Sequence, residues 1–287
     1  MAAAGGEASG HGSTAGPAAA ARDRGKRLVE PFRSTLEEFG DVVLLTGRTL
    51  GSAVRPPYPY GGELVSQFLF ALRLVWFPLL VTTVAISYGA PGLQAANFLS
   101  LFGALDRVGG IFVLAAVREI GPLITSVVVA GIAGTAITAD LGARKVREEL
   151  DALQVLGVDP VKNLVVPRFL ALVVVTGLFD IYALLFGIFG GIAAELVNGQ
   201  PLGPFWGTFF ANASTTDLWG SVLKSSCFGA IIAIVCCYKG MSASGGAEGV
   251  GRAVNQAVVV SFLGIGAFNY VFTQTLLATH PNILVIK

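Results

Sequence analysis

Four ionisable side chains lie inside or at the edge of long apolar stretches of this sequence. Arg118 and Glu119 directly precede an apolar run that begins at Ile120, Lys224 lies near the start of another, and Asp180 lies midway along a third. Charges at membrane depth are costly unless they are paired or hydrated, so such residues are functional candidates by default. We predict that Glu119 pairs with Lys224 and Arg118, lining a polar patch in an otherwise apolar cavity.

The same side chains allow a second interpretation, in which the charges form a structural salt-bridge cluster that fixes helix packing. Asp180 either faces a water-filled path or meets a basic residue of a neighbouring subunit. Catalysis inside a membrane would need a nucleophile or a paired acid and base at one depth. The sequence has no Gly-x-Ser-x-Gly, no intramembrane His, no paired Asp and no cluster with metal-ligand spacing. We therefore predict neither catalytic nor metal-binding residues.

A short, densely charged stretch, residues 145–156, lies between two apolar runs. Its pattern predicts an amphipathic helix with Val146, Leu150 and Leu153 on one face, ended by Gly157 as a cap. The stretch is too polar for lipid and too regular for a loose loop, so we place it just outside the membrane. A helix rooted in two spans suits a lever that a separate ATPase moves. The alternative is a solvated connecting helix.

The composition indicates the elements that position these residues. The chain has 287 residues, of which 54% are hydrophobic and 13% charged, whereas soluble domains carry about 25% charged residues. The apolar run at 120–139 would form a helix roughly 30 Å long, the thickness of a bilayer core. We predict an all-α integral membrane protein with five transmembrane helices, at about residues 64–88, 120–139, 164–197, 218–238 and 253–278.

Residues 94–116 are moderately apolar but contain Asp106 and Arg107. A sixth span here would put Arg144, Lys145 and Arg147 outside, against the rule that basic residues stay in the cytoplasm. We therefore expect a partly inserted helix on the outer side. The chain then has a cytoplasmic N-terminus and an extracytoplasmic C-terminus.

The N-terminal part differs from the rest in composition. Residues 1–27 are rich in Gly, Ala and Ser and predict a disordered cytoplasmic tail. Residues 28–62 predict an amphipathic helix at the membrane interface and a linker, with apolar residues on one helical face. The alternative is a helix packed on a soluble partner. Residues 63–287 form the membrane domain, with the charged helix at about 145–157. The apolar face comprises Leu28, Phe32, Leu36, Phe39 and Val43.

Four motifs make this sequence resemble a known family. They are REIGP at 118–122, VAGIAGTAITADLG at 129–142, REELDALQVLGVDP at 147–160 and LVVPR at 164–168. A fifth, GGAEGVGRAVNQAVV at 245–259, matches the turn before the last span of the same family. The sequence resembles MlaE/YrbE permeases over nearly all of residues 28–287, and most of all the permeases of actinobacterial Mce systems.

The resemblance implies a permease subunit of an ABC-type importer of lipid, such as a fatty acid, sterol or phospholipid, in the plasma (inner) membrane. It implies a heterodimer with a second YrbE-type permease, a cytoplasmic ATPase that binds ATP and Mg, and MCE-domain proteins on the outer face. No cofactor in this chain and no nucleic acid partner is implied. The alternatives are a membrane scaffold that anchors outer-face lipid-shuttle proteins and an intramembrane lipid-modifying enzyme.

The resemblance also assigns roles to particular positions. The charged cavity residues of the family correspond to Arg118, Glu119 and Lys224, whereas Asp180 matches no family pattern. The charged helix corresponds to the coupling helix on which the ATPase docks. The expected ATPase-coupling residues are Arg147, Glu148, Glu149, Asp151, Leu153, Gly157, Val158, Asp159 and Pro160.

Overall fold

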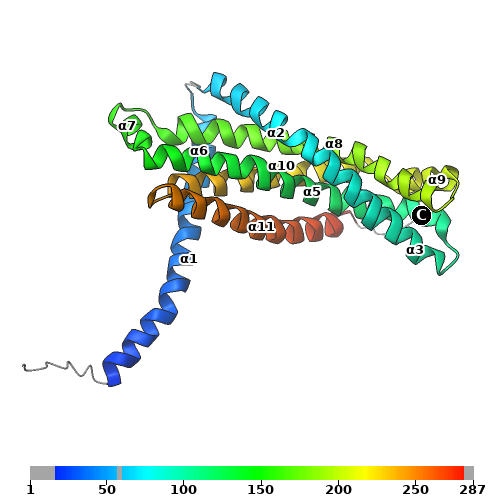
Figure 1. The fold of residues 1–287 in the computed structure, drawn as a ribbon, viewed down its shortest axis with the longest axis horizontal. Helices are drawn as coiled ribbons and strands as arrows, with labels where there is room; N and C mark the ends of the chain where they lie inside the picture. Colours follow the sequence, from blue (N-terminus) through cyan, green and yellow to red (C-terminus); the bar gives the residue numbers. More distant parts are fainter. Residues whose placement is uncertain (1–16, 57–59, 281–287) are drawn as a thin grey trace, which may run out of the picture. The chain divides into compact units, whose positions relative to one another are not determined.

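The protein is all-helical in the computed structural model, which describes residues 17–56 and 60–280, and within 17–35 only the helical backbone. Every regular element in these ranges is a helix (Figure 1). Five helices of the described chain are long and apolar enough to cross a membrane, which confirms the predicted fold class. They comprise Gly61–Ser100, Leu105–Val146, Val161–Val197, Thr215–Met241 and Gly246–Thr279.

The chain forms two compact units, which divide within helix α1 (Pro17–Val54) after Leu44. Because α1 begins at Pro17, residues 17–27 are helical rather than part of a disordered tail. The local sequence explains this difference, since alanine is the strongest helix former and proline suits the first position of a helix. Residues 1–16 of the predicted tail lie outside the described residues.

The predicted apolar face of the N-terminal helix is only partly described. Leu36, Phe39 and Val43 are exposed on α1, so this face is available to a membrane surface or to another protein. The side chains of Leu28 and Phe32 lie outside the described residues, as do residues 57–59 of the linker. The location of α1 at the membrane interface stays a prediction.

The first two spans are longer than their apolar runs suggest. The first comprises α2 (Gly61–Ser87), η1 (Tyr88–Gln94) and α3 (Ala95–Ser100). The second begins with η2 (Leu105–Arg107) and ends with α6 (Thr135–Val146). Residues 94–116 therefore do not form the separate, partly inserted helix that we expected. They are the adjoining ends of two spans.

Aromatic packing explains why these two ends stay helical. Phe112, in α4 (Val108–Phe112), is fully buried and packs against Phe205 and Phe209. Both partners belong to α9 (Leu202–Asn212), a short helix between the third and fourth spans. Burial of these rings stabilises a small apolar cluster at one end of the bundle, called here the α9 end.

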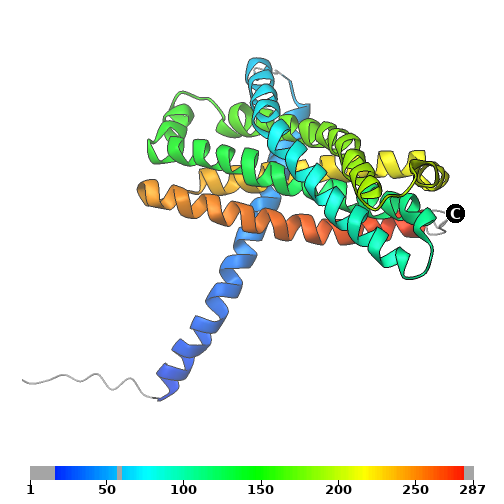
Figure 2. The ribbon, with the colours of Figure 1, turned by 45° about the vertical axis from the view of Figure 1, so that its right-hand side comes forward.

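The other three spans run alongside the first two (Figure 2). The third consists of η5 (Val161–Val165) and α8 (Val166–Val197), and α10 (Thr215–Met241) and α11 (Gly246–Thr279) are the fourth and fifth. The turn between α10 and α11 is short, because α10 ends at Met241 and α11 begins at Gly246. The end that holds the α6–α8 connection is called here the α7 end.

Glycines allow α8 to approach its neighbours closely. A Cβ at Gly190 would lie 2.5 Å from the Val84 carbonyl oxygen of α2, and a Cβ at Gly229 of α10 would lie 2.5 Å from the Leu172 carbonyl oxygen of α8. Backbones this close leave no space for a side chain, which is how helices in lipid gain packing energy. Gly187 and Gly191 of α8 belong to the same packing, because a Cβ there would lie 3.0 Å from Ser87 and 2.6 Å from Phe112, respectively.

We expect Gly229→Ala to lower the free energy of unfolding by about 1–3 kcal/mol, because the added methyl group must push α8 and α10 apart. Gly131→Ala is the matched control, since a Cβ there would meet nothing within 4 Å. Heating the protein in detergent and measuring the folded fraction by size-exclusion chromatography compares the two. Equal midpoints for both variants would show that the α8–α10 contact is not as tight as the structure indicates.

Candidate functional site

A π-helical segment in the second span carries two of the predicted site residues. η3 (Val113–Ile120) contains Arg118 and Glu119, and α5 (Gly121–Val129) follows it directly. Pro122 lies in the first turn of α5 and has no N–H, so it cannot donate to the Arg118 carbonyl four residues earlier. The local sequence therefore leaves this carbonyl without its usual helical donor. π-helical turns frequently lie at functional sites.

Lys224 of α10 reaches the Arg118 carbonyl from the neighbouring helix. Its Nζ donates to the Arg118 carbonyl oxygen at 2.7 Å and lies 3.2 Å from Glu119 Oε2. The lysine is 2% exposed, so its ammonium group depends on these partners. The predicted ion pair between Glu119 and Lys224 is confirmed.

Glu119 also connects the second span to the fifth. Its Oε1 accepts a hydrogen bond from Thr273 Oγ1 at 2.8 Å, and its Oε2 accepts one from Asn269 Nδ2 at 3.0 Å. Thr273 and Asn269 lie one helical turn apart on α11 and were missed at the level of sequence. Their spacing by four in an otherwise apolar run is the signal that could have found them.

The predicted pairing of Glu119 with Arg118 is wrong. The Arg118 guanidinium instead forms an ion pair with Asp217, with 2.7 Å between Nε and Oδ1. Asp217 is 2% exposed and also accepts hydrogen bonds from Ser214 in a capping box that begins α10. Adjacent residues on a helix point in different directions, so Arg118 and Glu119 meet different neighbours.

These side chains line a small enclosed cavity at the α9 end of the bundle. Its volume is about 20 Å³, enough for one water molecule. Two leucines line the cavity together with the charged groups, so the site is a polar patch with apolar neighbours. The lining residues are Arg118, Glu119, Asp217, Gly220, Ser221, Lys224, Thr273, Leu276 and Leu277.

Asp180 of α8 lies behind this cavity rather than in its lining. The side chain is fully buried, and its Oδ2 accepts a hydrogen bond from Ser221 Oγ at 2.6 Å. It therefore faces another helix of its own chain. Of the two alternatives, contact with a basic residue of a neighbouring subunit does not fit this burial, and a water-filled path stays a prediction. Because Ser221 lines the cavity, Asp180 is connected to the polar patch through one hydroxyl group.

We expect Asp180→Asn to be tolerated, because the amide oxygen can still accept the hydrogen bond from Ser221. Asp180→Leu should lower the free energy of unfolding by about 1–3 kcal/mol, since the buried Ser221 hydroxyl loses its acceptor. Thermal unfolding of both variants in detergent tests this. If Asp180→Asn were as damaging as Asp180→Leu, the charge rather than the hydrogen bond would be the essential feature.

The charged stretch forms a shorter helix than predicted. α6 ends at Val146 and α7 begins at Glu149, so α7 (Glu149–Val155) is separated from the second span by a turn. Glu148 adopts a left-handed backbone conformation with φ of 61°, which is uncommon for residues other than glycine. The turn redirects the chain so that Leu150 is buried. The prediction of a single helix over residues 145–157 is therefore wrong.

Ion pairs and a cap hold α7 in place. Lys145 of α6 lies 3.1 Å from Asp151 of α7, and the hydrogen bond with Glu149 raises the pKa of Arg147 above its usual value. The backbone N–H groups of Gly157 and Val158 donate to carbonyls of the last turn, with Gly157 at φ of 76°. This is the Schellman arrangement, and it confirms the predicted cap.

The end of α7 exposes two large apolar side chains. Val155 is 89% exposed and Leu156 is 76% exposed. Glu149 and Asp151 lie on the same short helix, while Leu153 is half-buried. The expected coupling residues at 157–160 continue from this point, and Asp159 Oδ1 accepts a hydrogen bond from the Val161 N–H at 2.9 Å. The result is a small, fixed projection with an apolar tip.

A buried arginine joins three spans at the α7 end. Arg168 of α8 is 1% exposed, and its Nη2 donates to Asp140 Oδ2 of α6 at 2.6 Å. Arg144 pairs with the same carboxylate at 3.2 Å, and Glu63 of α2 lies 3.7 Å from Arg168. The second span, which carries Asp140, is also the span that α7 follows in the chain.

Five apolar helices of the described residues are long enough to cross a membrane, and the short charged helix α7 lies between the second and the third. This is the arrangement of a membrane permease subunit. The chain belongs to the MlaE permease family, because residues 64–275 match the family described as Permease MlaE. It is thus the permease component of an ABC transporter and not itself an enzyme. The resemblance seen in the sequence is confirmed at the level of the family.

Similar proteins occur in bacteria and plants. A probable ABC transporter permease of Synechocystis sp. is 39% identical over 187 residues, covering 62% of this chain and 68% of that protein. One of Rickettsia typhi is 31% identical over 242 residues, covering 84% and 92%. The chloroplastic protein TRIGALACTOSYLDIACYLGLYCEROL 1 of Arabidopsis thaliana is 35% identical over 183 residues, covering 63% and 52%.

Proposed function

We propose that this chain is a transmembrane subunit of an ABC-type lipid importer that works with MCE-domain proteins and a separate ATPase. The observation that carries the proposal is α7, a short helix fixed by a cap and by an ion pair to the second span, which is itself joined to the first and third spans by the Arg168 network. A rigid projection of this kind can pass movement from a soluble motor to the membrane helices.

The α7 end is the cytoplasmic end in this proposal. Basic residues gather there, as the positive-inside rule requires of cytoplasmic connections. This orientation puts the N-terminus inside, makes the α9 end extracytoplasmic, and suits the plasma (inner) membrane. The residues that gather at the α7 end are Arg144, Lys145, Arg147, Lys162, Arg168, Lys239 and Arg252.

The ATPase, which would bind ATP and Mg, is proposed to dock on α7 and the turn after it. Val155 and Leu156 offer apolar area to a cleft, and the acidic side chains of Glu149 and Asp151 offer polar contacts at its rim. The Gly157 cap keeps this surface in one conformation. A second YrbE-type permease would complete the membrane part, as a heterodimer.

A lipid substrate is supported by the chemistry of the spans. Beyond the polar patch around Glu119 and Lys224, the spans present mainly apolar side chains, which suit a hydrophobic substrate such as a fatty acid, sterol or phospholipid. The Arabidopsis relative is named after a lipid, trigalactosyldiacylglycerol. MCE-domain proteins at the α9 end would deliver this lipid, and the ion-paired patch is proposed to line its path.

Reconstitution of the whole complex in vesicles tests the proposal. We expect lipid to stimulate ATP hydrolysis and labelled lipid, presented on the α9 side, to reach the vesicle membrane chemically unchanged. A passive scaffold would show no lipid-dependent hydrolysis, and a lipid-modifying enzyme would return an altered lipid. Transfer that runs only in the opposite direction would contradict the importer assignment.

A further inference from the structure

An arginine lies deep on the exposed face of the first span. Glu63 of α2 belongs to the ion network at the α7 end. Arg73 lies ten residues further along the same helix, about 15 Å away at 1.5 Å per residue. Its side chain is exposed, and among residues 17–56 and 60–280 none forms a hydrogen bond or ion pair with its guanidinium. The described part of the chain thus carries a cation inside a span without supplying its counter-charge.

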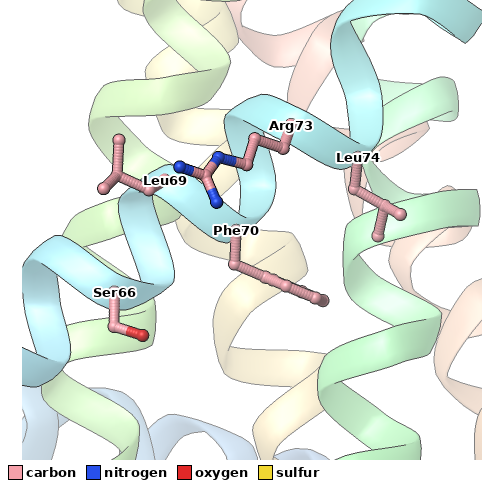
Figure 3. A pocket seen from close by; sticks show the side chains of 5 residues that line it. All are labelled: Ser66, Leu69, Phe70, Arg73 and Leu74. Carbon is pink, nitrogen blue, oxygen red and sulfur yellow. The ribbon is translucent and has the colours of Figure 1, made fainter.

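The surface around Arg73 is hollowed rather than smooth. An open hollow of about 360 Å³ is lined by Ser66, Leu69, Phe70, Arg73 and Leu74, all on α2 (Figure 3). The Arg73 side chain runs back along the helix toward Leu69 (Figure 3). A guanidinium group, a hydroxyl group one or two turns away and an apolar rim therefore share one face of this helix.

The Arg73 side chain approaches the headgroup level by extending back along the helix, on the side of Leu69 (Figure 3). It is shorter than the rise of about 15 Å that separates Arg73 from Glu63, so its charge lies between the ion network and the apolar middle of the span. An arginine at such depth is expensive unless it meets an anion or water. The first span is also poorly covered, since 22% of its most apolar stretch is buried against 61% in the second span.

A carboxylate of a second, similar subunit is a poor match for this charge. Among the described residues in the middle of the spans, Asp180 is fully buried and bonded to Ser221, and Glu119 already pairs with Lys224. The other acidic groups of the described spans lie near the helix ends. A phosphate with attached acyl chains matches the hollow better, because the hollow offers both a cation and apolar walls.

We propose that the hollow on α2 binds the phosphate headgroup of a phospholipid from the leaflet at the α7 end. The planar guanidinium of Arg73 would bind two phosphate oxygens, the geometry that arginine provides and lysine does not. Ser66 would bond a hydroxyl or ester oxygen of the headgroup, and Phe70 and Leu74 would contact the acyl chains. The inference rests on the proposed function for the membrane setting and adds a headgroup site on α2, apart from the polar patch around Glu119 and Lys224.

Native mass spectrometry of the purified complex tests this site without a transport assay. The probe is phosphatidylglycerol, supplied as a minor component of phosphatidylcholine nanodiscs. We expect Arg73→Gln to retain phosphatidylglycerol about tenfold less well than the unaltered protein, the effect of losing one charge-assisted contact. Arg107→Gln, which removes an exposed arginine at the α9 end, should retain it unchanged.

Ser66→Leu provides a second variant that keeps the arginine but fills the hollow, and it should also lose bound phosphatidylglycerol. Equal retention in Arg73→Gln and the unaltered complex would overturn the proposal. So would release of the second permease subunit from Arg73→Gln with lipid retention intact, because a partner carboxylate would then be the occupant. The proposed function could fail separately. If no lipid stimulated ATP hydrolysis by the unaltered complex while phosphatidylglycerol still bound at Arg73, the proposed function would be contradicted and the lipid site would stand.

Discussion

Lys224→Met should destabilise the protein by about 3 kcal/mol and stop transport. The substitution removes the cation that faces Glu119 and the donor to the Arg118 carbonyl, both of which Lys224 contacts from a buried position. Breaking a buried pair from one side costs about 3–5 kcal/mol, because the remaining charge is left without its partner. We expect a loss of stability at the lower end of this range, because Glu119 keeps its hydrogen bonds from Thr273 and Asn269.

The double variant Lys224→Met/Glu119→Gln separates a structural role of the pair from a functional one. Neither charge remains, so most of the lost stability should return. We expect lipid transport by the reconstituted complex to stay low, because the polar patch has lost both charges. Recovery of transport together with stability would show that the pair only fixes helix packing. Lys162→Met, at the α7 end, is a control that should leave stability and transport nearly unchanged.

Leu156→Asp should weaken binding of the ATPase by roughly a hundredfold, or about 3 kcal/mol. Leu156 is 76% exposed at the tip of α7, and burying such a side chain in a cleft stabilises a complex by about 1.5–3 kcal/mol. An aspartate there would also place an unpaired charge in the interface. Binding of the purified ATPase to the permease in nanodiscs, measured by surface plasmon resonance, gives the two dissociation constants.

Ser242→Asp is the matched control, since Ser242 is exposed in the turn between α10 and α11 at the same end of the bundle. It adds the same charge without touching α7 and should bind the ATPase normally. Deletion of residues 148–151 should abolish binding altogether, because it removes the turn at Glu148 and the first part of α7. Undiminished co-purification of the ATPase after that deletion would show that it docks elsewhere.

The candidate site was only half predictable. Glu119 and Lys224 could be paired from sequence because a buried lysine in an apolar run needs an acid, and few acids lie in such runs. Arg118 was assigned the wrong partner because Asp217 directly precedes the predicted fourth span at 218–238, and an exposed carboxylate is the usual expectation just outside a span. The capping box that buries Asp217 becomes visible only when Ser214 and the start of α10 are placed.

The sequence by itself determined the five spans, the Gly157 cap and the basic end of the molecule. Apolar length, cap chemistry and charge position belong to contiguous residues, so local physics decides them. Tertiary structure alone decided the ion pair between Arg118 and Asp217, 99 residues apart. It also decided the break before α7, because Glu148 takes its left-handed conformation without a local glycine, and burial of Leu150 determines where the chain turns.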